Sequence, residues 1–193
     1  MSDDLKFKHQ FTCILSGPSS SGKSSFCVRY LQYLDALCTE WEFDGGLIWC
    51  YSEKTAVSPP TVLSKRNVRL NEGFPADFHN AWGRPCFAIL DYFLNDVYSK
   101  HVCDLFTKGS LHRNIIVVLI TPNLFHKGRF SRDISLIAKY LVLLKNVREK
   151  NHFRFLSRQI YPENSTSLYK IRMIACVFEP IYSRRNRLLR TLP

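Results

Sequence analysis

The sequence predicts an α/β fold in which a mostly parallel sheet carries helices on both faces. Short apolar runs typical of buried strands alternate with helical patterns along the chain, and this alternation produces parallel sheets. The first run, residues 11–16, leads directly into a glycine-rich turn and then into a helical pattern. Open parallel sheets bind ligands at the carboxyl ends of their strands. The polar residues that end each run are therefore the candidate site.

The remaining strands follow in order. The run at 46–51 comes after a Gly-Gly pair, residues 67–70 form a short candidate edge strand, and the run at 85–91 ends in an acid. The run at 114–121, NIIVVLIT, is rich in β-branched residues, so we expect it to be buried on both faces. A further apolar run spans 140–144. Helical patterns are expected over 26–37, 96–107 and 148–160.

The glycine-rich turn is the stretch GPSSSGKSS, which matches G-x-x-x-x-G-K-[ST] between a strand and a helix. Its backbone N–H groups can surround phosphate oxygens, Lys23 can reach the β- and γ-phosphates, and Ser24 can ligate Mg²⁺. The alternative is a Ser/Gly-rich turn that only caps a helix. The motif predicts ATP and Mg²⁺ as cofactors. The expected nucleotide-binding residues are Gly17, Pro18, Ser19, Ser20, Ser21, Gly22, Lys23, Ser24 and Ser25.

Candidate catalytic residues end the other strands. Asp91 closes the run CFAIL and fits the acid that holds magnesium together with Ser24. Thr121 ends NIIVVLIT and is a further nucleotide-contact candidate. The acid that activates water often follows the magnesium acid directly, but Tyr92 stands there, and a phenol with a pKa near 10 is a poor base. Glu53 is the preferred substitute and Asp96 the alternative.

Length and composition predict one domain over residues 1–193. Residues 1–9 are expected to be an N-terminal extension and 163–193 a divergent, basic C-terminal segment. The chain is 46% hydrophobic, which is enough for one core. No apolar run approaches the ~18 residues of a membrane span, and the polar start does not look like a secretory signal. We expect an intracellular protein without a membrane partner, whose seven scattered cysteines are mostly buried free thiols.

Positive charge is concentrated in the second half of the chain. Residues 1–96 contain 9 Lys and Arg against 11 Asp and Glu, whereas residues 97–193 contain 18 against 5. Such asymmetry favours a polyanionic partner, most simply nucleic acid, over a solvated basic surface. Arg154 and Arg158 lie four residues apart, so one helix face can follow a phosphate backbone. A solvent-facing helix around an apolar stripe explains the same spacing equally well.

Five stretches in this order carry a resemblance: GPSSSGKSS, CFAILDYF, LFTKGSLHRNIIVVLITPNLFHKGRFSRDISL, YLVLLKNVREK and LSRQIYP. With them the chain resembles the genome-packaging ATPases of Polinton/Maverick elements. Those enzymes belong to the FtsK/HerA-type superfamily, together with the packaging ATPases of poxviruses and other large DNA viruses. The resemblance covers most of residues 10–162 and returns at RLLRTLP, residues 187–193.

The resemblance implies a RecA-like ATPase core that assembles as a ring, often a hexamer, and pumps double-stranded DNA into a capsid. It assigns Lys23 and Ser24 as the P-loop pair and Asp91 as the magnesium acid. Arg113 becomes the candidate arginine finger, with Arg129 and Arg132 behind it. It also implies capsid proteins as partners and a location in the host nucleus or cytoplasm, or with the virion.

Two departures from the resembled pattern fall on catalytic positions. Tyr92 stands where a second acid is usual, and Pro122 stands where a glutamine is usual. Proline offers neither an amide side chain nor a backbone N–H. Losing a general base or a water-orienting group typically slows a reaction by ~10²- to 10⁴-fold while phosphate binding survives. The sequence therefore predicts a degenerate packaging ATPase with slow hydrolysis, unless Glu53 supplies the missing acid.

Two other functions remain open. In the first, the chain has the same fold but does not hydrolyse ATP, so it is an ATP- and DNA-binding subunit. The other is a small P-loop nucleotide kinase, against which stand the long resemblance and the absence of an obvious Arg-rich lid between the third and fourth strands.

Overall fold

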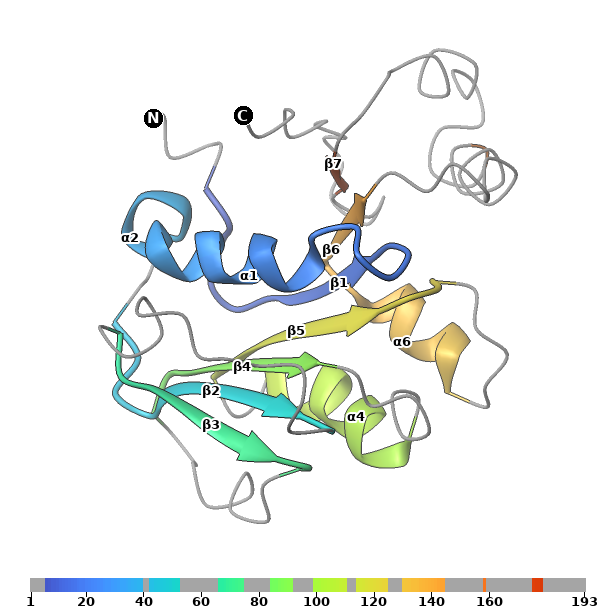
Figure 1. Ribbon diagram of the computed structural model, residues 1–193. Coiled ribbons are helices and arrows are strands. Elements are labelled where there is room, and N and C mark those ends of the chain that lie inside the picture. The colour runs from blue at the N-terminus through green and yellow to red at the C-terminus, as the bar shows by residue number, and fades with distance from the viewer. Residues whose placement is uncertain are drawn as a thin grey trace.

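The computed structural model describes residues 6–39, 42–52, 66–74, 84–91, 99–110, 114–124, 130–144, Arg158 and 175–178. Within these residues the strands form one seven-stranded sheet in the order β3-β2-β4-β5-β1-β6-β7 (Figure 1). The strands are β1 Thr12–Ser16, β2 Gly46–Tyr51, β3 Val68–Glu72, β4 Cys86–Asp91, β5 Ile115–Thr121, β6 Tyr140–Leu144 and β7 Ala175–Phe178. All neighbouring strands are parallel except β6 and β7. The predicted α/β fold is confirmed.

The register brings the carboxyl ends of the central strands to one edge of the sheet. Ser16 of β1 pairs with Thr121 of β5, and Asp91 of β4 pairs with Ile120 of β5. On the other side of β4, Tyr51 of β2 pairs with Asp91. The glycine-rich turn follows β1, so Asp91 lies one strand away from it, across β5.

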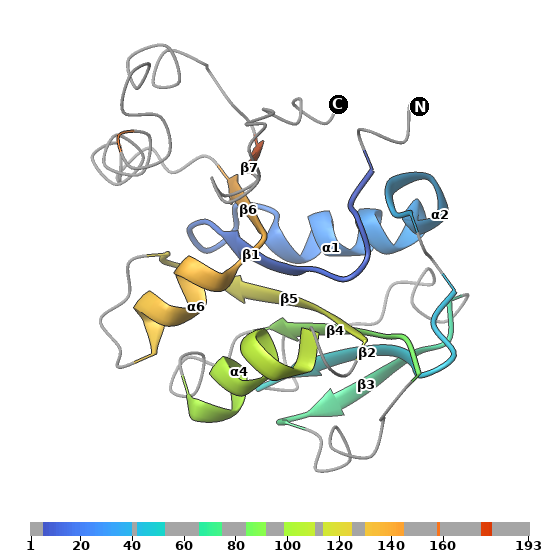
Figure 2. The ribbon, with the colours of Figure 1, turned by 180° about the vertical axis from the view of Figure 1, so that it is seen from behind.

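Helices cover both faces of the sheet (Figures 1 and 2). Helices α1 Lys23–Gln32 and α2 Leu34–Leu37 lie on one face. On the other face lie α4 Lys100–Asp104, the π-helical turn η4 Leu105–Gly109 and α6 Ser131–Ile137. Strands β1, β2, β4, β5 and β6 alternate their side chains between two separate apolar clusters, one under each helical layer. Strands β4 and β5 are buried along their whole length, as expected for strands covered on both faces.

Some helices differ from the sequence expectation. The pattern over 26–37 predicted one helix, but it breaks at Tyr33 into α1 and α2. The break leaves Tyr33 54% exposed while Leu34 is fully buried, so packing overrides local propensity. The expected helix at 96–107 begins at Lys100 in the described residues and continues to Gly109 as the π-helical turn. Helix α6 and strand β7 were not predicted.

The predicted buried thiols are present in the described residues. Cys13, Cys27, Cys38, Cys50 and Cys86 are buried free thiols, and Cys103 is partly exposed. Among the described residues, no helix is both long enough and apolar enough to cross a membrane.

Candidate nucleotide-binding site

The loop from Gly17 to Gly22 joins β1 to α1 and needs glycine at both ends. A Cβ on Gly17 would stand 2.8 Å from Leu144 Cβ and 2.8 Å from Ser21 Oγ, so a side chain does not fit. Gly22 caps α1 with φ 91°, in the left-handed region that glycine adopts without strain. The Gly17 N–H donates to Thr121 O over 3.2 Å, which fastens the start of the loop to β5.

The N-terminus of α1 has the features of an anion site. The first intrahelical bond runs from Phe26 N to Gly22 O over 2.8 Å, so the amides of the first turn have no acceptor within the helix. No side chain caps this end, and its first turn contains no acidic residue. These amides and the helix dipole together favour phosphate oxygens.

Lys23 lies inside this loop rather than on the surface. Its side chain is 4% exposed, and its Nζ donates to Gly17 O and to Pro18 O, each over 2.7 Å. These bonds hold the ammonium group against the loop whose N–H groups would receive a phosphate. Burial lowers the pKa of Lys23, and the negative charge of Asp91 opposes that shift.

Ser24 and Asp91 meet across β5. The Ser24 hydroxyl donates to Asp91 Oδ2 over 3.3 Å, although the two residues are 67 positions apart in the sequence. Asp91 is 2% exposed, and its other oxygen, Oδ1, is buried and has no hydrogen-bond partner among the described residues. Burial raises the pKa of Asp91, while the hydroxyl of Ser24, the indole of Trp49 and the charge of Lys23 oppose the rise.

The Ser24 and Asp91 oxygens fit a magnesium ion. Both are hard oxygen donors, and Oδ1 is a buried polar atom that lacks a partner among the described residues. Magnesium is commonly held by one or two protein oxygens, with water and substrate phosphates completing the shell. No cluster of three or more His, Cys, Asp or Glu that would suit a fully protein-bound metal occurs in the described part of the chain.

The end of β5 forms a closed turn beside this site. Thr121 is 1% exposed, and its hydroxyl donates to Asn123 O over 3.0 Å while it accepts from Asn123 N over 3.4 Å. Pro122 lies between them. The Thr121 hydroxyl is thus engaged within its own turn, and no side-chain amide stands at position 122.

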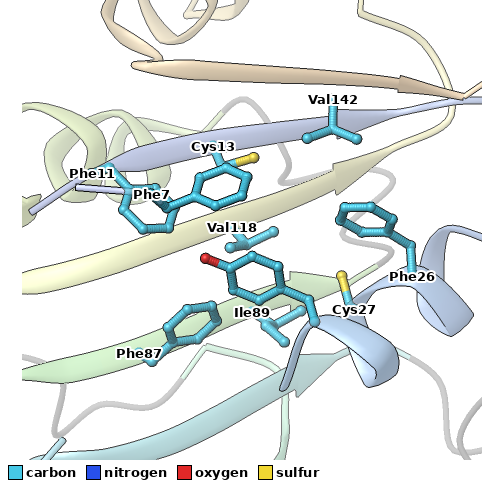
Figure 3. Close-up of a pocket in the computed structure, with 10 residues that line it drawn as sticks. Phe7, Phe11, Cys13, Phe26, Cys27, Phe87, Ile89, Val118 and Val142 are labelled. Atoms are coloured by element: carbon cyan, nitrogen blue, oxygen red, sulfur yellow. The ribbon is translucent and has the colours of Figure 1, made fainter. Parts of the chain in front are cut away.

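The cavity between α1 and the sheet is not a second ligand site (Figure 3). It is lined by apolar side chains such as Phe11, Phe26, Phe87 and Val118. Its volume is about 10 Å³, and the hydroxyl of Tyr30 is paired with Cys38 Sγ at 2.8 Å. A water molecule needs about that much volume and several polar partners. The cavity is a packing defect of the core.

Several predicted site residues lie outside the described residues. They are Glu53, Tyr92, Asp96, Arg113 and Arg129. Strand β2, which leads toward Glu53, lies directly beside β4. Arg132 is exposed in the first turn of α6, and Arg158 is exposed and helical. The rest of the basic stretch at 145–157 is not described.

The comparisons with known proteins agree with this geometry. No family model and no curated protein matches the sequence. Among solved structures, B204, the DNA-packaging ATPase from Sulfolobus Turreted Icosahedral Virus, aligns with a TM-score of 0.62 at 14% identity. That alignment covers 95% of this chain and 98% of the viral one. The chain has a RecA-like P-loop NTPase fold.

Further structures of this P-loop fold belong to the genome packaging NTPase B204 of Sulfolobus turreted icosahedral virus 2. Its AMP complex aligns with a TM-score of 0.61 over 95% of this chain and 98% of that chain, at 14% identity. Its ATP-γS complex aligns with a TM-score of 0.58 over the full length of both chains, again at 14% identity.

Sequence reasoning missed one residue of the site, Trp49. Its side chain is 1% exposed, and its Nε1 is buried without a hydrogen-bond partner among the described residues. Trp49 stands two residues before the end of β2, on the α1 face of the sheet. Alternation along the run GLIWCY places Trp49 and Tyr51 on one face, but the sequence does not tell which strand lies beside β2.

Proposed function

We propose that the protein is an ATP-driven ATPase that packages or translocates double-stranded DNA, with hydrolysis slowed by Tyr92 and Pro122. Its cofactors are ATP and Mg²⁺. It works as a homo-oligomeric ring, hexamer-like, inside the cell or with the virion, and capsid proteins are its further partners. The proposal places it with the FtsK/HerA-type packaging ATPases of Polinton elements and large DNA viruses.

One observation carries the nucleotide part of this proposal, namely the hydrogen bond between Ser24 and Asp91. A Ser/Gly-rich turn that only capped a helix would not need a buried acid facing its first helical residues. Burying a carboxylate costs stability, so an acid at such a position is a candidate functional residue. Here Lys23, Ser24 and Asp91 converge beside amides suited to phosphate. Magnesium, when bound, supplies positive charge beside the β- and γ-phosphates.

The DNA part rests on charge and on the likeness of the whole chain to B204. The second half of the chain carries 18 of the 27 Lys and Arg residues. Contacts from Lys and Arg side chains to DNA phosphates give affinity without sequence specificity, which suits movement along any DNA. B204 is described as a DNA-packaging ATPase, and the alignment spans nearly all of both chains.

The hydrolytic step has two candidate supports from this chain. Glu53 follows the strand that pairs with β4, so we propose it as the acid that takes a proton from the attacking water. Arg113 is the proposed finger that completes a neighbouring subunit's site, and Arg132 is an exposed alternative.

A second candidate function is a subunit that binds ATP and DNA without turnover. The closed turn at Thr121 and Asn123 favours it, because the engaged Thr121 hydroxyl does not replace the amide that Pro122 lacks. Binding would survive this loss, since the loop, Lys23 and the Ser24–Asp91 pair do not depend on position 122. A small nucleotide kinase has no comparable support.

The deciding experiment measures phosphate release from ATP and Mg²⁺, with and without double-stranded DNA. A working motor shows turnover that DNA stimulates and that Lys23→Ala and Glu53→Gln both abolish. Arg113→Ala lowers turnover without lowering ring formation, which light scattering measures as concentration-dependent oligomers. Tight ATP binding with no turnover under any condition supports the second candidate. Absence of ATP binding overturns both.

A further inference from the structure

Trp49 and Asp91 present two buried polar atoms that lack partners on the same face of adjacent strands. Trp49 Nε1 and Asp91 Oδ1 have no hydrogen-bond partner among the described residues. Their side chains are 1% and 2% exposed. Leaving a buried donor or acceptor unpaired costs stability, so such atoms are rare without a reason. Trp49 Nε1 can only donate and the ionised Asp91 Oδ1 can only accept, so the two atoms are suited to pair with each other.

The strand register supports this pairing. Trp49 lies directly opposite Ile89, and Tyr51 lies opposite Asp91. Asp91 is therefore the diagonal neighbour of Trp49, two positions along β4. Residues two apart in a strand share a face, so Trp49, Ile89 and Asp91 all face α1. Diagonal neighbours are within reach of a long aromatic side chain.

We propose that Trp49 is a positioning residue for the magnesium acid. Its indole N–H donates to Asp91 Oδ1 while the Ser24 hydroxyl donates to Oδ2, so the carboxylate is held from two sides. Each carboxylate oxygen has two lone pairs, so these bonds leave acceptor capacity for the ion. A carboxylate fixed in this way keeps one orientation toward the site of the ion. This inference rests on the proposed nucleotide site, and it adds a residue that the P-loop motif does not contain.

The predicted effect is specific to magnesium. The phosphate cradle consists of the loop amides and Lys23, whose Nζ donates to Gly17 O and Pro18 O. Loss of the indole N–H therefore leaves nucleotide affinity without magnesium within about twofold of its original value. The magnesium concentration for half-maximal strengthening of nucleotide binding rises about tenfold to a hundredfold, as expected for a lost hydrogen bond to a charged group.

The first test detects the hydrogen bond between the Trp49 indole and Asp91 in protein without nucleotide. The full-length protein is labelled with ¹⁵N and its three tryptophan indole N–H signals are recorded, with Trp49→Phe assigning the signal of interest. Asp91→Leu removes the acceptor and is expected to move the Trp49 indole proton upfield. Lys100→Ala changes an exposed residue at the start of α4, on the other face of the sheet, and leaves that signal in place. A Trp49 signal that does not respond to Asp91→Leu overturns the contact.

The second test measures how the Trp49 N–H affects the magnesium dependence of nucleotide binding. Trp49 is replaced by 3-benzothienylalanine, which keeps the size and shape of the ring system and replaces N–H with sulfur. Binding of a fluorescent ADP analogue is then titrated in EDTA and across magnesium concentrations. A raised magnesium requirement with unchanged affinity in EDTA supports the proposal. An unchanged magnesium requirement overturns the positioning role even if the contact exists.

The two tests separate failure of this inference from failure of the proposed function. If the wild-type protein binds no nucleotide, the proposed function fails and the positioning role fails with it. The indole signal still reports the contact in that case. If the wild-type protein binds nucleotide with magnesium and the isosteric variant behaves in the same way, the site stands and Trp49 has no part in it.

Discussion

The carboxylate of Asp91 is buried, and burial disfavours its charge. Its folded pKa is raised above the ordinary value of 3.8, first by desolvation, while Ser24, Trp49 and Lys23 oppose the rise. The folded state thus binds the Asp91 proton more tightly than the unfolded state does. The stability that this proton contributes is fully present below pH 3.8 and is lost as pH rises through the raised folded pKa. At neutral pH the ionised carboxylate therefore destabilises the protein when no metal ion is bound.

Asp91→Asn is therefore expected to raise the melting temperature at pH 7 by a few degrees in nucleotide-free protein with EDTA. The gain should shrink as pH falls toward 3.8, where the wild-type carboxyl is protonated. Differential scanning calorimetry over this pH range measures both. Ser24→Ala is the control, because it removes the hydrogen bond to Asp91 while it keeps the charge. A lower melting temperature for Asp91→Asn at pH 7 would show that the ionised carboxylate is stabilised by its neighbours.

The same substitution is expected to raise stability but to impair the response to magnesium. We expect Asp91→Asn to abolish the strengthening of nucleotide binding by magnesium, because an amide is a much weaker ligand for a hard cation than a carboxylate. Isothermal titration with ADP, with and without magnesium, measures this. A variant that is more stable but has lost its magnesium response identifies Asp91 as a residue kept for function. An intact magnesium response in Asp91→Asn would move the metal site elsewhere.

The loop between β1 and α1 combines two different glycine requirements. At Gly17 the obstacle is space, since a Cβ would meet Leu144 and Ser21 at 2.8 Å. At Gly22 the space is open, because a Cβ there would have nothing within 4 Å, and the obstacle is the positive φ. The two causes therefore predict opposite effects when asparagine takes the place of alanine at each position.

Gly22→Ala should cost about 1–2 kcal/mol of unfolding free energy, the usual penalty of a left-handed backbone for alanine. Gly22→Asn should recover part of it, because asparagine tolerates this conformation. Gly17→Ala should cost about 1–3 kcal/mol through overpacking, and Gly17→Asn should be worse, not better. Urea denaturation of the four variants measures these values. Equal responses to asparagine at both positions would contradict the distinction.

The elements of this fold were easier to predict from the sequence than their arrangement. Local signals sufficed for the strands ending at Ser16, Asp91 and Thr121, because apolar runs and the motif mark them directly. The insertion of β5 between β1 and β4 depends on long-range pairing that no local signal encodes. The break at Tyr33 was missed because it serves the burial of Leu34. Trp49 was missed because its role depends on which strand pairs with β2.

At the scale of the whole molecule, positive charge is separated from the acidic first half. Arg66 in that half donates to Gln32 O and pairs with Asp35 at 3.5 Å. Arg158 in the second half is exposed. The two arginines therefore make a matched pair for testing where DNA is bound, since both reach solvent but only one lies in the basic half.

Arg158→Ala is expected to weaken binding to double-stranded DNA of any sequence and to reduce the slope of log affinity against log salt by about 1, the value for one lost phosphate contact. Arg66→Ala should leave the slope unchanged, because Arg66 is engaged within the protein. Fluorescence anisotropy with two unrelated duplexes at several salt concentrations measures both variants. Equal losses for the two would mean that net charge alone attracts DNA. No loss for Arg158→Ala would require the DNA contacts to come from other basic residues.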